Sequence, residues 1–194
     1  MMRLGVLFIG LTGLLACAEV RDRSEDSHDM VDLPMNSPSM LFNEVLASND
    51  NDAPVIRDAY GEAEDALELY NLTEDALDLE GWRIDIDDGA ADYTFPPEAR
   101  LAAGGHLVLW CDGETEAQQE VVLGRFHANF KIAKEGATLE LFTPDGQRAD
   151  EVRWGEGEDA PFEPQRTNIS LARETDGGEP WLASDPPTMG ASNN

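Results

Sequence analysis

Short apolar runs, each closed by turn residues, fill the sequence from residue 41 onward and argue against a helical domain. Runs of about five to eight residues alternate apolar with polar side chains, and none keeps a 3.6-residue apolar period over a helical length. Turn formers separate these runs, and Pro144-Asp145-Gly146 predicts a hairpin between the runs on either side of it. The pattern predicts an all-β sandwich or small barrel. We expect strands at 41–47, 66–71, 82–86, 93–95, 106–110, 126–131, 138–142, 150–154 and 168–172.

The period-2 alternation also predicts which side chains form the core. Leu67 and Leu69 share one face of the expected strand, so Glu68 is predicted to point into solvent from the other face. A second alternating pair of leucines precedes Gly81-Trp82, where the glycine allows a turn and the indole adds apolar surface. The predicted interior comprises Leu67, Leu69, Leu79, Trp82, Leu107, Leu109, Phe130, Leu139 and Leu141.

The N-terminus has the pattern of an export signal. Arg3 precedes an apolar run that ends at Leu15 and is shorter than the roughly 20 residues that a membrane-spanning helix needs. The sequence Leu14-Leu15-Ala16-Cys17 resembles the lipobox of bacterial lipoproteins, which implies acylation of Cys17 and anchoring by acyl chains. Ala18 in place of Asp implies outer-membrane sorting, facing either the periplasm or the cell surface. The expected organisation is a signal peptide (1–16), an acidic flexible tether (17–40) and one domain (41–194).

Charge limits the class of partner. The 194 residues include 40 Asp and Glu against 13 Lys and Arg, a formal net charge of -27. Such a surface repels phosphate backbones, so nucleic acid is not an expected partner. Most carboxylates are interpreted as solvated outer faces.

Several stretches together resemble the lamin-tail domain, an immunoglobulin-like β-sandwich. They are "LFNEVLASN", "ELYN" with "LDLEGWRI", "TFPPEARLAAGGHLVLWCDG", "HANFKIAKEGATLELFTPDGQRADEV" and "DPPTMGASN", in order from residue 41 to residue 193. Because such sandwiches serve many roles, the resemblance implies the fold and not an activity. We expect a lipid-anchored, non-catalytic interaction or structural module of the cell envelope, with a protein or polysaccharide partner still to be identified. The alternative is a small envelope hydrolase or a calcium-dependent carbohydrate- or wall-binding protein on the same scaffold.

Calcium is the one cofactor that the sequence suggests. Asp58, Glu62 and Asp65 lie close enough in an acidic loop to surround a hard cation. EF-hand spacing fails, because Gly61 stands fourth from Asp58 instead of sixth. A solvated acidic loop is the competing interpretation. The run from Asp85 to Gly89 also fails this spacing and is interpreted as a hairpin turn.

No enzyme signature is evident in the sequence. There is no G-x-S-x-G, H-E-x-x-H or P-loop motif, and no catalytic residue is predicted. A thiol nucleophile or a metal site made of Cys111, His106 and His127 is the alternative, but a cysteine at a strand end is more often a small buried apolar residue. Tryptophans at strand positions are more often core than a sugar-stacking platform; they are Trp82, Trp110, Trp154 and Trp181.

Overall fold

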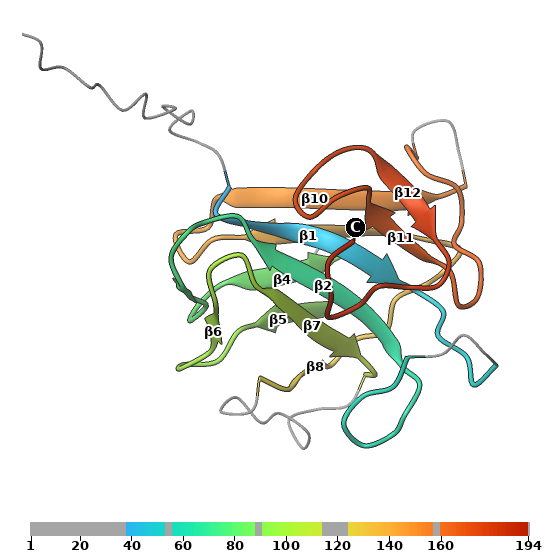
Figure 1. Cartoon of the computed structure of the whole chain (residues 1–194), viewed down its shortest axis with the longest axis horizontal. Coiled ribbons are helices and arrows are strands. Elements are labelled where there is room, and N and C mark those ends of the chain that lie inside the picture. Colours follow the sequence, from blue (N-terminus) through green and yellow to red (C-terminus); the bar gives the residue numbers. More distant parts are fainter. Residues whose placement is uncertain (1–37, 53–55, 88–90, 114–123, 157–159, 194) are drawn as a thin grey trace, which may run out of the picture. The chain divides into compact units, whose positions relative to one another are not determined.

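The computed structural model describes residues 38–52, 56–87, 91–113, 124–156 and 160–193 (Figure 1). Twelve strands and no helix occur within these ranges. The strands are β1 (Met40–Leu46), β2 (Asp65–Asn71), β3 (Leu77–Asp78), β4 (Arg83–Ile86), β5 (Ala91–Thr94), β6 (Arg100–Leu101), β7 (His106–Cys111), β8 (Phe126–Ala128), β9 (Gly136–Phe142), β10 (Arg148–Gly155), β11 (Ser170–Arg173) and β12 (Trp181–Ser184). The described residues include no helix with the length and apolar character needed to span a membrane.

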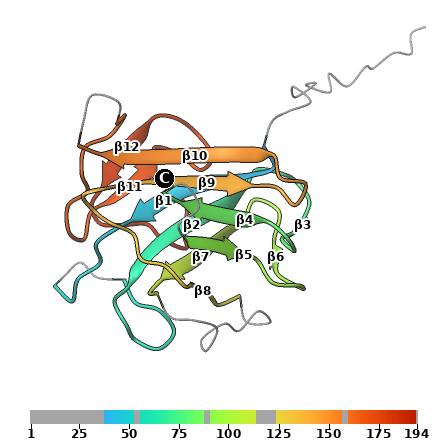
Figure 2. The same cartoon turned by 180° about the vertical axis from the view of Figure 1, so that it is seen from behind.

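The strands form a β-sandwich, as the sequence predicted. A six-stranded sheet has the order β12-β11-β1-β2-β7-β8, and a four-stranded sheet has the order β10-β9-β4-β5. The two sheets stack as layers, one in front in Figure 1 and the other in front in Figure 2. The pairs within both sheets are antiparallel except β7 with β8, which is parallel. The predicted β9–β10 hairpin is present, and β4 pairs with β5 as expected.

The core lies between the two sheets and holds all nine predicted residues. Leu67, Leu69, Leu79, Trp82, Leu107, Leu109, Phe130, Leu139 and Leu141 are all buried in one cluster. Phe95 packs edge-on against Tyr93 and Phe126, with ring centroids 5.0 and 5.6 Å away. Burying each such side chain contributes about 1.5–3 kcal/mol to the stability of the fold. The apolar residues at alternate positions of each strand therefore form this interior.

Each predicted strand is present, with changed bounds. Lys131 lies beyond β8, and Met40, assigned to the tether by the sequence, is fully buried as the first residue of β1. Three strands were missed: β3 and β6, which pair with each other, and β12, which pairs with β11. Two-residue strands carry no measurable alternation, and β12 has two exposed residues in succession.

Glu68 is buried, so its predicted exposure to solvent is wrong. Its side chain does leave β2 on the face opposite Leu67 and Leu69, but residues 185–193, here called the C-terminal strap, cover that face. Figure 1 shows the dark red C-terminal segment crossing in front of β1 and β2. Gly190 N donates to Glu68 Oε2 over 2.5 Å. The carboxylate is therefore a buried hydrogen-bond acceptor.

A second buried carboxylate also holds the strap. Glu44, fully buried on β1, accepts hydrogen bonds from Thr188 N at 2.9 Å and Thr188 Oγ1 at 2.7 Å. Asn43 stands at a register shift in β1 and donates from Nδ2 to Glu68 Oε1 over 2.8 Å. These bonds satisfy polar groups that would otherwise be costly to bury.

Candidate functional site

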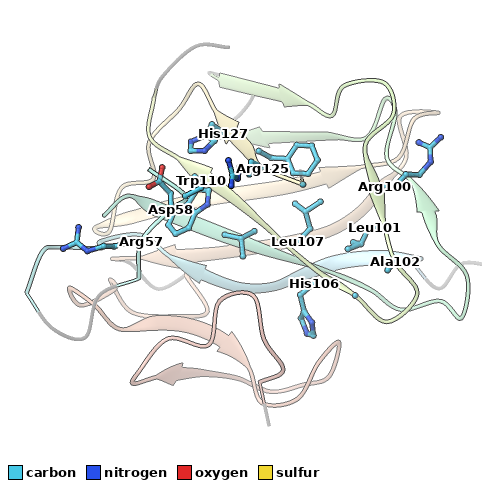
Figure 3. Close-up of a pocket in the computed structure, with 15 residues that line it drawn as sticks. Arg57, Asp58, Arg100, Leu101, Ala102, His106, Leu107, Trp110, Arg125 and His127 are labelled. Carbon is cyan, nitrogen blue, oxygen red and sulfur yellow. The ribbon is translucent and has the colours of Figure 1, made fainter. Parts of the chain in front are cut away.

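A groove of about 470 Å³ runs along β7 and β8, beside the loop of residues 56–62 (Figure 3). It lies partly on the outer face of the six-stranded sheet, because Trp110 alternates with the core residues Leu109 and Cys111. Its polar and aromatic lining residues include Arg57, Asp58, His106, Trp110, Arg125 and His127. We refer to this feature as the β7–β8 groove.

Asp58 builds the turn at one end of the β7–β8 groove. Its Oδ1 atom accepts hydrogen bonds from Tyr60 N at 2.9 Å and Glu62 N at 2.7 Å, the geometry by which aspartate closes a tight turn. The Oδ2 atom is buried and has no hydrogen-bond partner in the described part of the chain. Asp58 as a whole is only 9% exposed. A buried acceptor without a donor costs about 1–3 kcal/mol.

Asp112 and His127 form a buried pair next to this turn. The Nδ1 atom of His127 lies 2.5 Å from Asp112 Oδ2, and both side chains are almost fully buried. The β7–β8 register places His127 directly beside Trp110. The ring of Tyr60 contacts the imidazole with centroids 5.9 Å apart, which links the Asp58 turn to β8. The carboxylate fixes the orientation of the imidazole.

Sequence reasoning missed the Asp112–His127 pair and the Asp58 turn. The pair depends on the parallel contact between β7 and β8, for which the sequence offered no hairpin signal. In the sequence, Asp58 is distinguished only as one carboxylate among several in an acidic loop. An aspartate three residues before a turn glycine was the signal available for the turn, since Asp58 O also accepts from Gly61 N at 3.3 Å.

Arg57 brings positive charge to the same end of the groove. Its Nη1 donates to Gly61 O over 2.7 Å and its Nη2 donates to Asn51 Oδ1 over 2.9 Å. Both acceptors are neutral, so the charge of the guanidinium is not compensated by these bonds. Arg125 lines the groove close to Trp110 and His127 in Figure 3.

The three predicted calcium ligands are not gathered around one point. Asp58 uses one oxygen for its own turn, and Glu62 is exposed. Asp65 is the first residue of β2, and its Oδ1 atom accepts a hydrogen bond from Asn49 N at 3.3 Å. Burial raises the pKa of Asp65 above its usual value, partly offset by that hydrogen bond. Within the described ranges, no three His, Cys, Asp or Glu side chains are close enough together to hold a metal ion. Calcium binding stays a prediction.

The structure separates Cys111 from the two histidines considered with it. Cys111 points into the core, is fully buried, and lies 3.7 Å from Leu109 O through its sulfur. Burial raises the pKa of its thiol well above the usual value, an effect that nearby Asp65 and Asp112 increase. His127 is bound to Asp112 on the outer face, and His106 lies at the opposite end of β7. Cys111 therefore packs as a small apolar residue.

His106 instead lies near the C-terminal strap. Its Nε2 atom is 3.0 Å from Asp176 Oδ1. Burial tends to raise the pKa of Asp176, but hydrogen bonds, led by that from Asn193 N at 3.0 Å, outweigh it and lower this pKa to about 2. Cys17, the predicted lipidation residue, lies outside the described residues.

Comparison with known proteins identifies one matching family. Residues 34–156 match the model of the Lamin Tail Domain family. The crystal structure of a DUF4876 family protein from Bacteroides thetaiotaomicron is similar at 13% sequence identity, with a TM-score of 0.44 over 77% of this chain and 68% of that chain. No curated protein matches. The family match ends within the loop after β10, while the described sandwich continues through β11, β12 and the strap.

Proposed function

The chain belongs to the lamin tail domain family, and we propose that it is a non-catalytic binding module held at the cell envelope by a lipid on Cys17. The lipobox-like sequence before Cys17 supports the anchor, and Ala18 supports outer-membrane sorting. The observation that carries the binding role is the β7–β8 groove, where a buried carboxylate oxygen lacks a partner beside a half-buried indole.

The side chains that could serve as nucleophile and base favour binding over catalysis. The thiol of Cys111 is on the core side of β7, and its raised pKa keeps it protonated at neutral pH. The imidazole of His127 is on the other side of the sheet. A thiol and a base on opposite faces cannot exchange a proton directly.

A small envelope hydrolase is the second candidate, and the Asp112–His127 pair is the observation that favours it. A carboxylate that orients an imidazole is the arrangement of a general base. If this pair were catalytic, purified protein would release soluble fragments from isolated envelopes, and His127→Gln would abolish the release. For a binding module we expect sedimentation with envelopes and no such release.

The anchor is tested by labelling the native host with a radioactive fatty acid. Cys17→Ser removes the acylation nucleophile, so this variant should carry no label and should remain as an unprocessed or mislocalised precursor. Cys111→Ala is the matched control, because Cys111 is the only other cysteine of the chain. It should keep the label and the membrane fractionation of the parent. A Cys17→Ser protein that is labelled and matures like the parent would overturn the lipid anchor.

A further inference from the structure

Building on the proposed binding role, we propose that the β7–β8 groove is a saccharide-binding site. In it, Asp58 Oδ2 accepts a hydrogen bond from a sugar hydroxyl, and the indole of Trp110 contacts the apolar face of the same sugar ring. The ligand class is a neutral oligosaccharide.

The state of Asp58 is the first observation that indicates a ligand. This side chain is nine-tenths buried, its Oδ1 atom is held by two backbone N–H groups, and its Oδ2 atom has no partner in the described structure. The turn thus fixes the position of an acceptor before any ligand arrives. A donor that reaches this atom recovers a lost hydrogen bond.

The exposure of Trp110 is the second observation. The other tryptophans are core residues, with exposures of 5% for Trp82, 2% for Trp154 and 8% for Trp181. Trp110 is only half-buried and lines the groove at the end where Asp58 and His127 lie (Figure 3). A partly exposed aromatic ring beside fixed polar groups is suited to a ligand that has both an apolar face and hydroxyls at its edge.

The charges in the groove decide between ligand classes. An ammonium group would be attracted by Asp58 but repelled by Arg57 and Arg125, which line the same groove. An anionic group would be attracted by the arginines but would meet Asp58 and a chain of net charge -27. A neutral hydroxyl avoids both repulsions, since it can donate to the carboxylate and accept from a guanidinium. The groove volume of about 470 Å³ is within the range of small-molecule sites.

Isothermal titration of the full-length chain tests this site with four neutral tetrasaccharides: those of cellulose, amylose, mannan and N-acetylated chitin. The parent should bind at least one of them with a Kd below about 1 mM. Asp58→Asn keeps the Oδ1 acceptor of the turn and replaces Oδ2 with a donor, so it should weaken this binding about tenfold or more. Trp110→Ala should weaken it to a similar degree. Glu80→Gln, which makes the same charge change at an exposed residue outside the groove, should leave the affinity unchanged.

Two controls make the outcome decisive. Thermal melts check that the variants fold. If Asp58→Asn has a clearly lower melting temperature than the parent, the effect of Trp110→Ala on binding is used alone to test the site. Ethanolamine and tetragalacturonate serve as a cationic and an anionic probe. The saccharide site is overturned if the parent binds none of the neutral tetrasaccharides, if neither variant weakens binding, or if only a charged probe binds. None of these results alters the fatty-acid labelling of Cys17, so failure of this site and failure of the anchor are distinguishable.

Discussion

Glu68 should make the stability of the domain depend on pH in a way that one substitution can isolate. Burial under the C-terminal strap raises the pKa of Glu68 from 4.5 to about 7. The hydrogen bonds from Asn43 and Gly190 and the nearby His106 oppose this shift, while Glu44 adds to it. Asp176 also faces this cluster, but its pKa of about 2 leaves it ionised throughout the range considered.

The direction in which stability changes with pH follows from proton binding by Glu68. Between its unfolded and folded pKa values, Glu68 is protonated in the folded state and ionised in the unfolded state, so folding takes up a proton. The contribution of Glu68 to stability is therefore fully present below about pH 4.5 and is lost as the pH rises through about 7. From about pH 5 to pH 8, the loss amounts to about 2–3 kcal/mol of unfolding free energy.

Glu68→Gln removes the titration and should remove this loss. Glutamine replaces one acceptor oxygen with an amide nitrogen, so we expect a constant destabilisation of about 1 kcal/mol at every pH. Urea unfolding, followed by tryptophan fluorescence at several pH values, gives both curves. The parent should lose about 2–3 kcal/mol more than the variant between about pH 5 and pH 8. Parallel curves for the two proteins would show that Glu68 does not titrate in this interval, and Glu80→Gln serves as the exposed control.

Three further predictions concern packing and cations. Leu109→Ala, at a fully buried position, should cost about 2–5 kcal/mol in urea unfolding, and a cost under about 1 kcal/mol would contradict its place in the core. Gly155→Ala should destabilise by more than about 1 kcal/mol, because φ is +139° and a Cβ would lie 2.9 Å from Gly136 Cα; an unchanged melting temperature would contradict this close approach. Calcium chloride should raise the melting temperature no more than sodium chloride of equal ionic strength. An extra increment that disappears in the combined variant Asp58→Asn, Glu62→Gln and Asp65→Asn would instead establish the calcium site.

The sandwich core could be predicted because its signal is local. Leu67 and Leu69 in β2, and Leu139 and Leu141 in β9, each occupy alternate positions of one strand, and all four are fully buried. Period-2 alternation reports the face on which a side chain lies without any knowledge of the partner strands. The turn residues between the runs then predicted the antiparallel hairpin of β9 with β10.

The burial of Glu68 could not be predicted in this way. Alternation correctly placed its side chain opposite Leu67 and Leu69, but it carries no information about what covers that face. The covering residue Gly190 is 122 positions away in the sequence, and its backbone N–H, not its side chain, makes the contact. The sequence pattern of a glutamate between two leucines is the same whether water or a strap covers the glutamate.

Asp58 shows how geometry changes the meaning of a residue that the sequence had already singled out. As one carboxylate among several in an acidic loop, it suggested a cation, since calcium requires six to eight oxygen ligands. In the folded chain, Oδ1 is used by the backbone of its own turn, and the nearby carboxylates of Glu62 and Asp65 do not converge with it. A single remaining oxygen is too few for such a cation but is enough for one hydroxyl donor. The number of free acceptor oxygens, which only the turn geometry reveals, thus favours a hydrogen-bonded organic ligand at this position over a metal ion.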